Sequence, residues 1–389
     1  MFPNRRCMGS KNRLLIIMLF TAILFSFRSE ARPYYYPQVR YVGSSSESMG
    51  GGVLSNTDEL GNAMMNNPAG LARFKGFRAE PLNLNFSMNS NLVSNVGTAL
   101  LGSTTLGGIS STMNSNTSSP FGLGGSNLTA FSWGGVAVGF LWQEHSRAIS
   151  DGTTASYQAV SQFIPTIGYG FGLARNIIRV GYSLQYVNET SGTATATSDS
   201  SASYLSGLSK GSGLSHNVSI NFSLPFTYLP SLSVIARNLG GLHFTGSRLL
   251  SRGTNFSGTL SSENMSVDAS FDFLVKITSN LKTHWYLEYR DLGNHVSFPS
   301  YFERINMGVD LALNRSISFR GGMTGIANFS AGLGYRSENG EINLAYYKEK
   351  SPFSYGDSWD TRYALQYKVM LYEQAKKADG ELQEVGSKR

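Results

Sequence analysis

Apolar and polar residues alternate with a period of two along most of the chain after residue 78. Between Ile178 and Tyr186, for example, every second position carries Ile, Val, Tyr, Leu or Tyr, and the positions between them are Arg, Gly, Ser and Gln. Alternating segments of about ten residues are typical of membrane β-strands. Beyond the N-terminal 31 residues, the sequence has no run of about 18 apolar residues, so no helical membrane span is expected there.

This alternation predicts fourteen strands joined by connections that are mostly short and long in turn. In hydrocarbon, a sheet satisfies every backbone N–H and C=O only by closing on itself. The expected fold is therefore all-β, a transmembrane antiparallel β-barrel of about 14 strands over residues 79–371, with both termini in the periplasm. A soluble β-sandwich would have shorter strands of about five or six residues. The predicted strands are 79–90, 127–133, 136–149, 155–171, 176–190, 212–226, 229–240, 264–277, 281–291, 302–313, 316–324, 328–338, 341–350 and 361–371.

Many of the positions expected to face the lumen carry charge. Two interpretations stay open: ion-pair networks that keep the barrel rigid, or a path for a solute. The residues are Arg179, Arg237, Asp268, Asp272, Glu288, Arg290, Asp310, Arg320, Arg336 and Arg362.

The N-terminus has the layout of a secretory signal peptide. A basic stretch precedes the apolar run Leu14 to Phe25, and small residues at Ser29 and Ala31 predict cleavage after Ala31. An uncleaved anchor helix is the alternative. Residues 1–31 contain the single cysteine, Cys7, so the mature chain has no disulfide, thiol nucleophile or cysteine metal ligand.

Composition supports an exported membrane protein. Charged residues make up only 15% of the chain, whereas a soluble domain usually carries about 25%. Removal of residues 1–31 lowers the formal net charge from +7 to +3, and no basic cluster that would bind nucleic acid remains. No cofactor is expected. The mixed-charge stretch 372–389 is expected to be a periplasmic tail.

Residues 32–78 do not alternate, and they contain Gly50-Gly51-Gly52, Asp58 and the run Asn66 to Ala72. Glycine permits close backbone packing and Asn-Pro favours a turn, so the segment could fold into the lumen as a plug. The motif from Gly50 to Ala72, placed just before the first strand, resembles the N-terminal hatch of the FadL-type long-chain fatty acid transporters. It is equally similar to the related PorV-type barrels of protein secretion.

The resemblance implies a fourteen-stranded barrel in the cell outer membrane, closed by a hatch over 32–78 and surrounded by outer-membrane lipid. It implies transport of a hydrophobic small-molecule ligand such as a long-chain fatty acid. The alternative is a PorV-like adaptor whose partners are secretion-system or surface proteins. The Ser/Thr/Ala-rich loop 191–211 departs from the transporter pattern, because it offers little apolar surface.

Two groups of residues are candidates for ligand binding. The first is the hatch turn, and the second is an apolar face at helical spacing in the loop after the first strand, which could instead simply pack on the barrel. They are Asn67, Pro68, Ala69 and Gly70, and Leu92, Val93, Val96 and Leu100.

An enzyme is not expected. The stretch Gly207-Leu208-Ser209-Lys210-Gly211 matches the Gly-x-Ser-x-Gly pattern of hydrolases, but that pattern requires a strand-to-helix elbow. In this sequence the match lies in a Ser-rich stretch, and we interpret it as chance. A porin or a purely structural barrel remains a further alternative.

Overall fold

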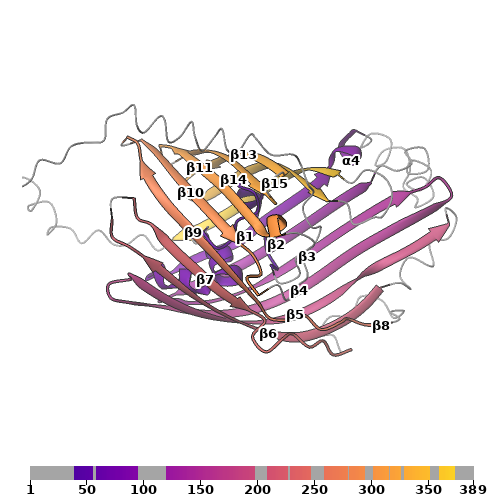
Figure 1. Ribbon diagram of the computed structural model, residues 1–389, viewed down its shortest axis with the longest axis horizontal. Coiled ribbons are helices and arrows are strands. Elements are labelled where there is room, and N and C mark those ends of the chain that lie inside the picture. The colour runs from indigo at the N-terminus through magenta and orange to yellow at the C-terminus, as the bar shows by residue number, and fades with distance from the viewer. Residues whose placement is uncertain are drawn as a thin grey trace, which may run out of the picture.

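The computed structural model describes residues 39–55, 58–94, 120–197, 208–226, 228–246, 258–278, 280–293, 301–314, 316–325, 328–350 and 359–372. Fourteen antiparallel strands form a closed barrel (Figure 1). They are β1 (Arg78–Asn89), β2 (Phe121–Trp133), β3 (Val136–Ser150), β4 (Thr154–Leu173), β5 (Ile178–Thr197), β6 (Leu208–Ser223), β7 (Ser231–Arg237), β9 (Ser266–Lys276), β10 (Leu281–Tyr289), β11 (Ile305–Leu313), β12 (Ile317–Thr324), β13 (Asn328–Arg336), β14 (Gly340–Lys350) and β15 (Trp359–Tyr372).

Each barrel strand pairs with its sequence neighbours, and β1 pairs with β15 to close the sheet. The short β8 (Gly258–Thr259) lies outside this order and pairs in parallel with β6. The predicted all-β barrel and its strand count are confirmed. The signal peptide at 1–31 and the tail expected at 372–389, apart from Tyr372, lie outside the described residues.

Several predicted strand ends were wrong. Strand β2 begins at Phe121 rather than 127, and β5 and β6 extend into the expected loop 191–211. Thr197 pairs with Thr154, and Ser191 pairs with Val160. Beyond residue 190, β5 carries Ser and Thr at one set of alternate positions and Gly and Ala at the other, with no large apolar side chain. Alternation reports a lipid-facing surface, so it is lost where a strand continues beyond the hydrocarbon.

The outer surface of the barrel is apolar and the inner surface is polar. On β15, Tyr363, Leu365 and Tyr367 are 44–46% exposed, whereas the intervening Gln366 and Lys368 are 0% exposed. This reversal of the usual pattern of a soluble protein is that of a barrel surrounded by lipid. Among the described residues, no helix is long and apolar enough to cross a membrane.

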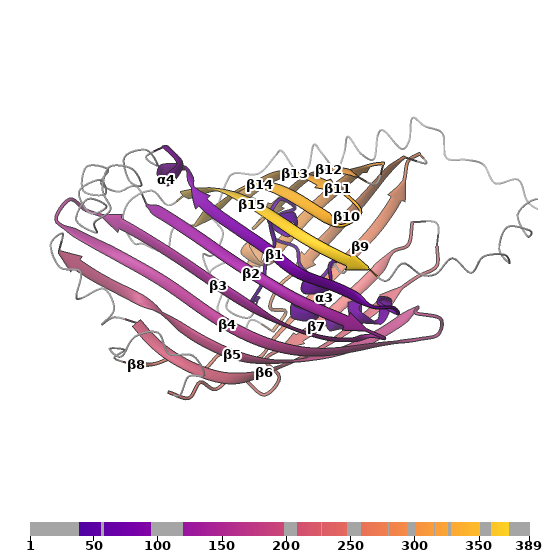
Figure 2. The same ribbon diagram turned by 180° about the vertical axis from the view of Figure 1, so that it is seen from behind.

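The wall of the barrel has two heights, as Figures 1 and 2 show. Strands β4 and β5 have 20 residues each, whereas β12 has 8. At about 3.3 Å per residue these lengths correspond to roughly 66 Å and 26 Å. Because a spanning strand needs about 9–11 residues, the β3–β6 wall extends well beyond the bilayer on the side of the long loops.

The N-terminal segment lies inside the barrel. It contains α2 (Ser44–Glu47), α3 (Leu60–Asn66) and the 3₁₀ helix η1 (Pro68–Arg73). All residues from Gly43 to Leu54 and from Glu59 to Ala72 are buried. Two further short helices, α4 (Ser90–Ser94) and η3 (Tyr301–Arg304), follow β1 and precede β11. The N-terminal segment therefore fills part of the barrel lumen.

Candidate functional site

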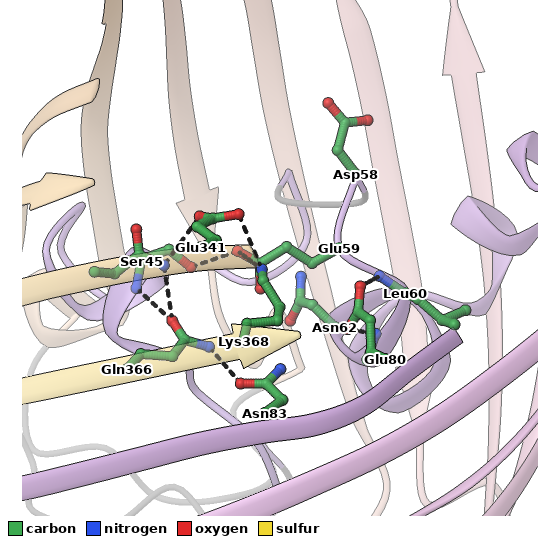
Figure 3. Close-up of polar contacts among 12 residues, drawn as sticks. Ser45, Asp58, Glu59, Leu60, Asn62, Glu80, Asn83, Glu341, Gln366 and Lys368 are labelled. Carbon is green, nitrogen blue, oxygen red and sulfur yellow. Dashed lines mark hydrogen bonds and ion pairs between the residues drawn. The ribbon is translucent and has the colours of Figure 1, made fainter. Parts of the chain in front are cut away.

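An ionic cluster holds the N-terminal segment against the β14–β15 wall (Figure 3). Lys368 of β15 is fully buried, and its Nζ lies 3.2 Å from Glu59 Oε1 and 3.3 Å from Glu341 Oε2. These are ion pairs by distance, although the Nζ has no aligned hydrogen bond. Glu59 belongs to the N-terminal segment and Glu341 to β14. Lys368 therefore joins the segment to the wall through charges shielded from water, where pairing matters most.

Two other strands, β1 and β10, supply carboxylates that accept hydrogen bonds from backbone amides of the segment. Glu80 of β1 accepts from Leu60 N at 2.9 Å and Gly61 N at 3.1 Å, which satisfies the first turn of α3. Glu288 of β10 accepts from Val53 N at 2.9 Å and Leu54 N at 3.0 Å. Both carboxylates are 0% exposed. They replace the backbone hydrogen-bond acceptors that this short irregular segment lacks.

Strand glycines let the segment approach the wall closely. A side chain at Gly170 or Gly181 would overlap the backbone of Pro68, and one at Gly308 or Gly322 would overlap that of Met49. Gly168 and Gly332 also face the segment, since a Cβ added there would meet the side chains of Leu71 and Ser48. The backbone of the segment therefore lies directly on the inner face of the sheet.

The contact with the β2–β5 wall is apolar instead. Met64, Met65 and Leu71 are at most 1% exposed and belong to one cluster with wall residues including Leu141 and Ile164. We call this contact the apolar seam. The wall residues of the seam are Leu128, Ala130, Ala137, Leu141, Ile164 and Val187.

The β4–β5 ladder is interrupted beside the apolar seam. Phe163 pairs with Asn188 and pairing resumes at Thr166 with Gln185, so Ile164 and Pro165 are skipped. Proline has no N–H to donate. The Asn188 side chain donates to Phe163 O at 3.1 Å and compensates in part. The wall thus has fewer backbone hydrogen bonds where its inner face is apolar.

The predicted hatch-turn residues are buried at the seam end of the segment. Asn67 is 0% exposed and donates to Leu54 O at 2.7 Å, and Pro68 starts η1. The N–H of Ala69 donates to Ser219 Oγ of β6 at 2.7 Å, and Gly70 N donates to Asn67 O at 2.9 Å. The four residues contact each other and the wall.

The second predicted group is only partly within the described residues. Leu92, in α4, packs against the small cluster of Phe121 and Ala148. Val93 is 45% exposed. Val96 and Leu100 lie outside the described residues. Leu92 and Val93 are not brought into contact with Asn67 to Gly70.

Several of the lumenal charges expected from strand parity form buried pairs. Arg237 donates to Asp268 at 2.8 Å, and Arg320 lies 3.3 Å from Asp310. Elsewhere in the lumen, Arg40 of the N-terminal segment pairs with Glu189 and Glu263. Five residues of these contacts were not predicted as functional from the sequence: Arg40, Glu59, Glu80, Glu341 and Lys368. Strand alternation does place Glu341 and Lys368 on the lumenal face, because the residues next to them along the strand face lipid.

A charged cavity of about 690 Å³ opens beneath the segment at the end of the short turns. Turn and near-turn residues such as Leu229, Asn314 and Ser316 line it, which places it at the periplasmic end. In the part of the chain that the structure describes, no group of three His, Cys, Asp or Glu side chains is arranged to hold a metal.

The hydrolase-like pattern has no catalytic setting. Its described residues Leu208 to Gly211 lie in the strand β6 and pair with Gly192 to Glu189 of β5. They were expected in a loop, and the strand corrects that expectation. A strand without the elbow does not present the serine as a nucleophile.

Comparison with solved structures identifies the fold. The CymD monoaromatic hydrocarbon channel matches with a TM-score of 0.50 over 86% of this chain and 98% of that chain, at 11% identity. The two chains share the same barrel fold. This agrees with the resemblance carried by the Gly50 to Ala72 motif, and the apolar outer face places the barrel in the outer membrane.

Two other matches are weaker and add no argument. The Pseudomonas putida toluene transporter TodX matches at a TM-score of 0.41 and 10% identity, over 88% of this chain and 99% of that chain. The Ralstonia pickettii toluene transporter TbuX matches at 0.39 and 12%, over 86% and 99%. No family model matches the chain. No curated protein matches it either.

Proposed function

We propose that this barrel transports hydrophobic small molecules across the outer membrane, with residues 32–78 as the hatch and residues 1–31 as the export signal. The apolar seam carries the proposal. A plug needs only to fit, and polar contacts like those at Lys368 and Glu288 would be enough to hold it. The seam instead places flexible methionines and leucines against an apolar wall inside an otherwise polar lumen.

A hydrophobic ligand can replace the hatch at the seam without exposing that wall to water. When Leu71 or Met64 separates from Ile164, the apolar wall loses its contact with the hatch and gains an equivalent contact with the hydrophobic ligand. A polar solute would leave the wall without an apolar partner. The hatch turn Asn67 to Gly70 then serves to anchor the moving end, and the apolar residues Leu92, Val93, Val96 and Leu100 serve to capture ligand outside.

We further propose long-chain fatty acids as substrates, on the resemblance of the Gly50 to Ala72 motif. The monoaromatic hydrocarbon channel with the same fold makes small aromatic hydrocarbons the natural comparison ligand. Both probes belong in the test.

A disulfide between hatch and wall tests the proposal. Ala69 N lies 2.7 Å from Ser219 Oγ, and the mature chain has no cysteine, so the Ala69→Cys/Ser219→Cys pair is the only thiol pair. We expect cells that carry the oxidised variant to take up labelled oleate and toluene at background rates, and reduction to restore uptake. The two single-cysteine variants are the controls. Uptake that is equal in the oxidised and reduced states would refute movement of the hatch at the seam.

A PorV-like adaptor for secretion or surface attachment is the second candidate, and the tall β3–β6 wall favours it. Strands of 20 residues offer a surface beyond the bilayer that transport alone does not require. An adaptor would give no protein-dependent uptake of either probe in any variant, and it would retain a surface protein when purified from its own membrane.

A further inference from the structure

The periplasmic cavity contains an arginine without a carboxylate partner. Arg179, near the start of β5, lines the cavity and is 4% exposed. Its Nη2 donates to Ser223 Oγ at 2.6 Å, while its Nε is buried without an acceptor. Among the described residues, no acidic oxygen lies within 4.0 Å of its guanidinium. A buried guanidinium left in this state is costly, and a ligand that pairs with it would offset that cost.

The other charges of the cavity are almost all matched. Arg73 lies 2.8 Å from Asp58, and Arg336 lies 3.0 Å from Glu341. His284 approaches Asp272 at 3.3 Å. Arg179 is therefore set apart by its surroundings, since it lines the same cavity as several acids and contacts none of them.

Hydroxyl and apolar groups lie around this arginine. Ser223 Oγ is 2.8 Å from Ser231 Oγ, so the two hydroxyls continue the polar edge that Arg179 begins. Leu229 and Leu274 line the same cavity. A guanidinium that has no carboxylate partner and lies beside hydroxyl and apolar groups is suited to bind a carboxylate with an attached alkyl group.

We propose that Arg179 forms a carboxylate-binding site in the periplasmic cavity, which takes an organic acid with its carboxylate on the guanidinium. The carboxylate accepts from the part of the guanidinium that lines the cavity, and Ser223 orients the guanidinium. The site rests on the proposed function only for the origin of the ligand, which would be a transported fatty acid on the periplasmic side of the hatch. A small free carboxylate is the other source of the same chemistry.

Binding of [1-¹³C]octanoate to the full mature protein in lipid nanodiscs tests this site, with the carboxyl carbon observed by NMR. We expect saturable binding that Arg179→Gln weakens tenfold or more, because a buried charge-assisted pair is lost. Arg175→Gln is the matched control, since Arg175 is exposed in the adjoining turn and does not line the cavity. Competition by acetate would identify small carboxylates as the source, and competition by decanoate alone would identify amphiphilic acids.

Two results would overturn the proposal. One is equal octanoate affinity in the Arg179→Gln and unchanged proteins, and the other is competition by 1-octanol as effective as that by octanoate. The alcohol experiment uses the unchanged protein, so it decides even when Arg179→Gln fails to fold. Arg179→Lys, which keeps the charge and loses the fork, should bind more weakly than the unchanged protein. If octanoate binding depends on Arg179 but the protein supports no uptake, the transport proposal alone is contradicted.

Discussion

Replacement of Lys368 by methionine should release the N-terminal segment while the barrel stays closed. Methionine has a similar length and no charge, so the change removes two ion pairs with little change in volume. Glu341 retains Arg336 at 3.0 Å and Arg320 at 3.6 Å. Glu59, with its side chain 5% exposed, retains only the Ser45 hydroxyl at 2.6 Å among the described residues. The loss therefore falls on the segment.

Breaking a buried ion pair by removing one partner costs about 3–5 kcal/mol. Because the cost falls on Glu59, we expect the free energy of local opening of residues 39–72 to drop by about this amount. That corresponds to a loss of roughly two to four orders of magnitude in amide protection. The strand β4, which does not contact Lys368, serves as the internal reference.

Hydrogen exchange followed by mass spectrometry measures this loss, and a second substitution tests its cause. Glu59→Gln neutralises the stranded carboxylate, so the double variant Lys368→Met/Glu59→Gln should recover most of the protection. Unchanged protection of residues 39–72 in Lys368→Met would refute the argument. So would a loss of the same size in β4, because the change would then act on the whole barrel.

Three further predictions concern separate contacts. Gly181→Val should displace η1 and lower protection of residues 60–72, whereas Gly125→Ala should be neutral because its added Cβ would meet nothing within 4 Å; unaltered exchange in the valine variant would contradict the close approach. Leu71→Ala should weaken the docking of the segment by about 2–5 kcal/mol, measured as exchange of α3, and no change would show that the seam does not hold it. In the β3–β4 loop, amide hydrogen bonds from residues 154 and 153 lower the pKa of Asp151 below its usual range. The contribution of its carboxylate is thus present above the unfolded pKa and is lost as pH falls through the folded one. NMR should therefore show a turn that persists through the usual carboxyl titration range in the unchanged protein and opens only at lower pH, whereas the turn in Asp151→Asn should not respond to pH.

The barrel could be predicted from sequence wherever the outer face meets lipid. The run from Ile178 to Tyr186 alternates because each second side chain faces hydrocarbon, and β5 begins at Ile178 as the pattern starts. The extension of β5 to Thr197 could not be predicted in this way. Beyond the bilayer, its partners in β4 supply backbone hydrogen bonds that impose no pattern on the side chains.

The candidate site could be predicted only in outline. The glycines and the Asn-Pro turn predicted a compact segment before the first strand. The role of the strand glycines could not be predicted, because it depends on how the backbone of Pro68 and Met49 docks against them. The contact of Lys368 with Glu59 joins residues about 300 positions apart, and no local periodicity reports such a pair. The unpaired state of Arg179 is likewise a property of its neighbours in space.

The two sides of the N-terminal segment differ in how they can separate from the wall, and this difference gives a proposed movement its direction. On the β14–β15 side, separation leaves Glu59 as a buried charge without its lysine, and no hydrophobic ligand can compensate it. On the seam side, a hydrophobic ligand takes the place of Met64 or Leu71 against the wall. The ionic side is therefore expected to act as the hinge and the seam as the opening. A tether between Ser48 and Ser330, whose Oγ donates to Ser48 O at 3.1 Å, should accordingly leave uptake far less affected than the tether at Ala69.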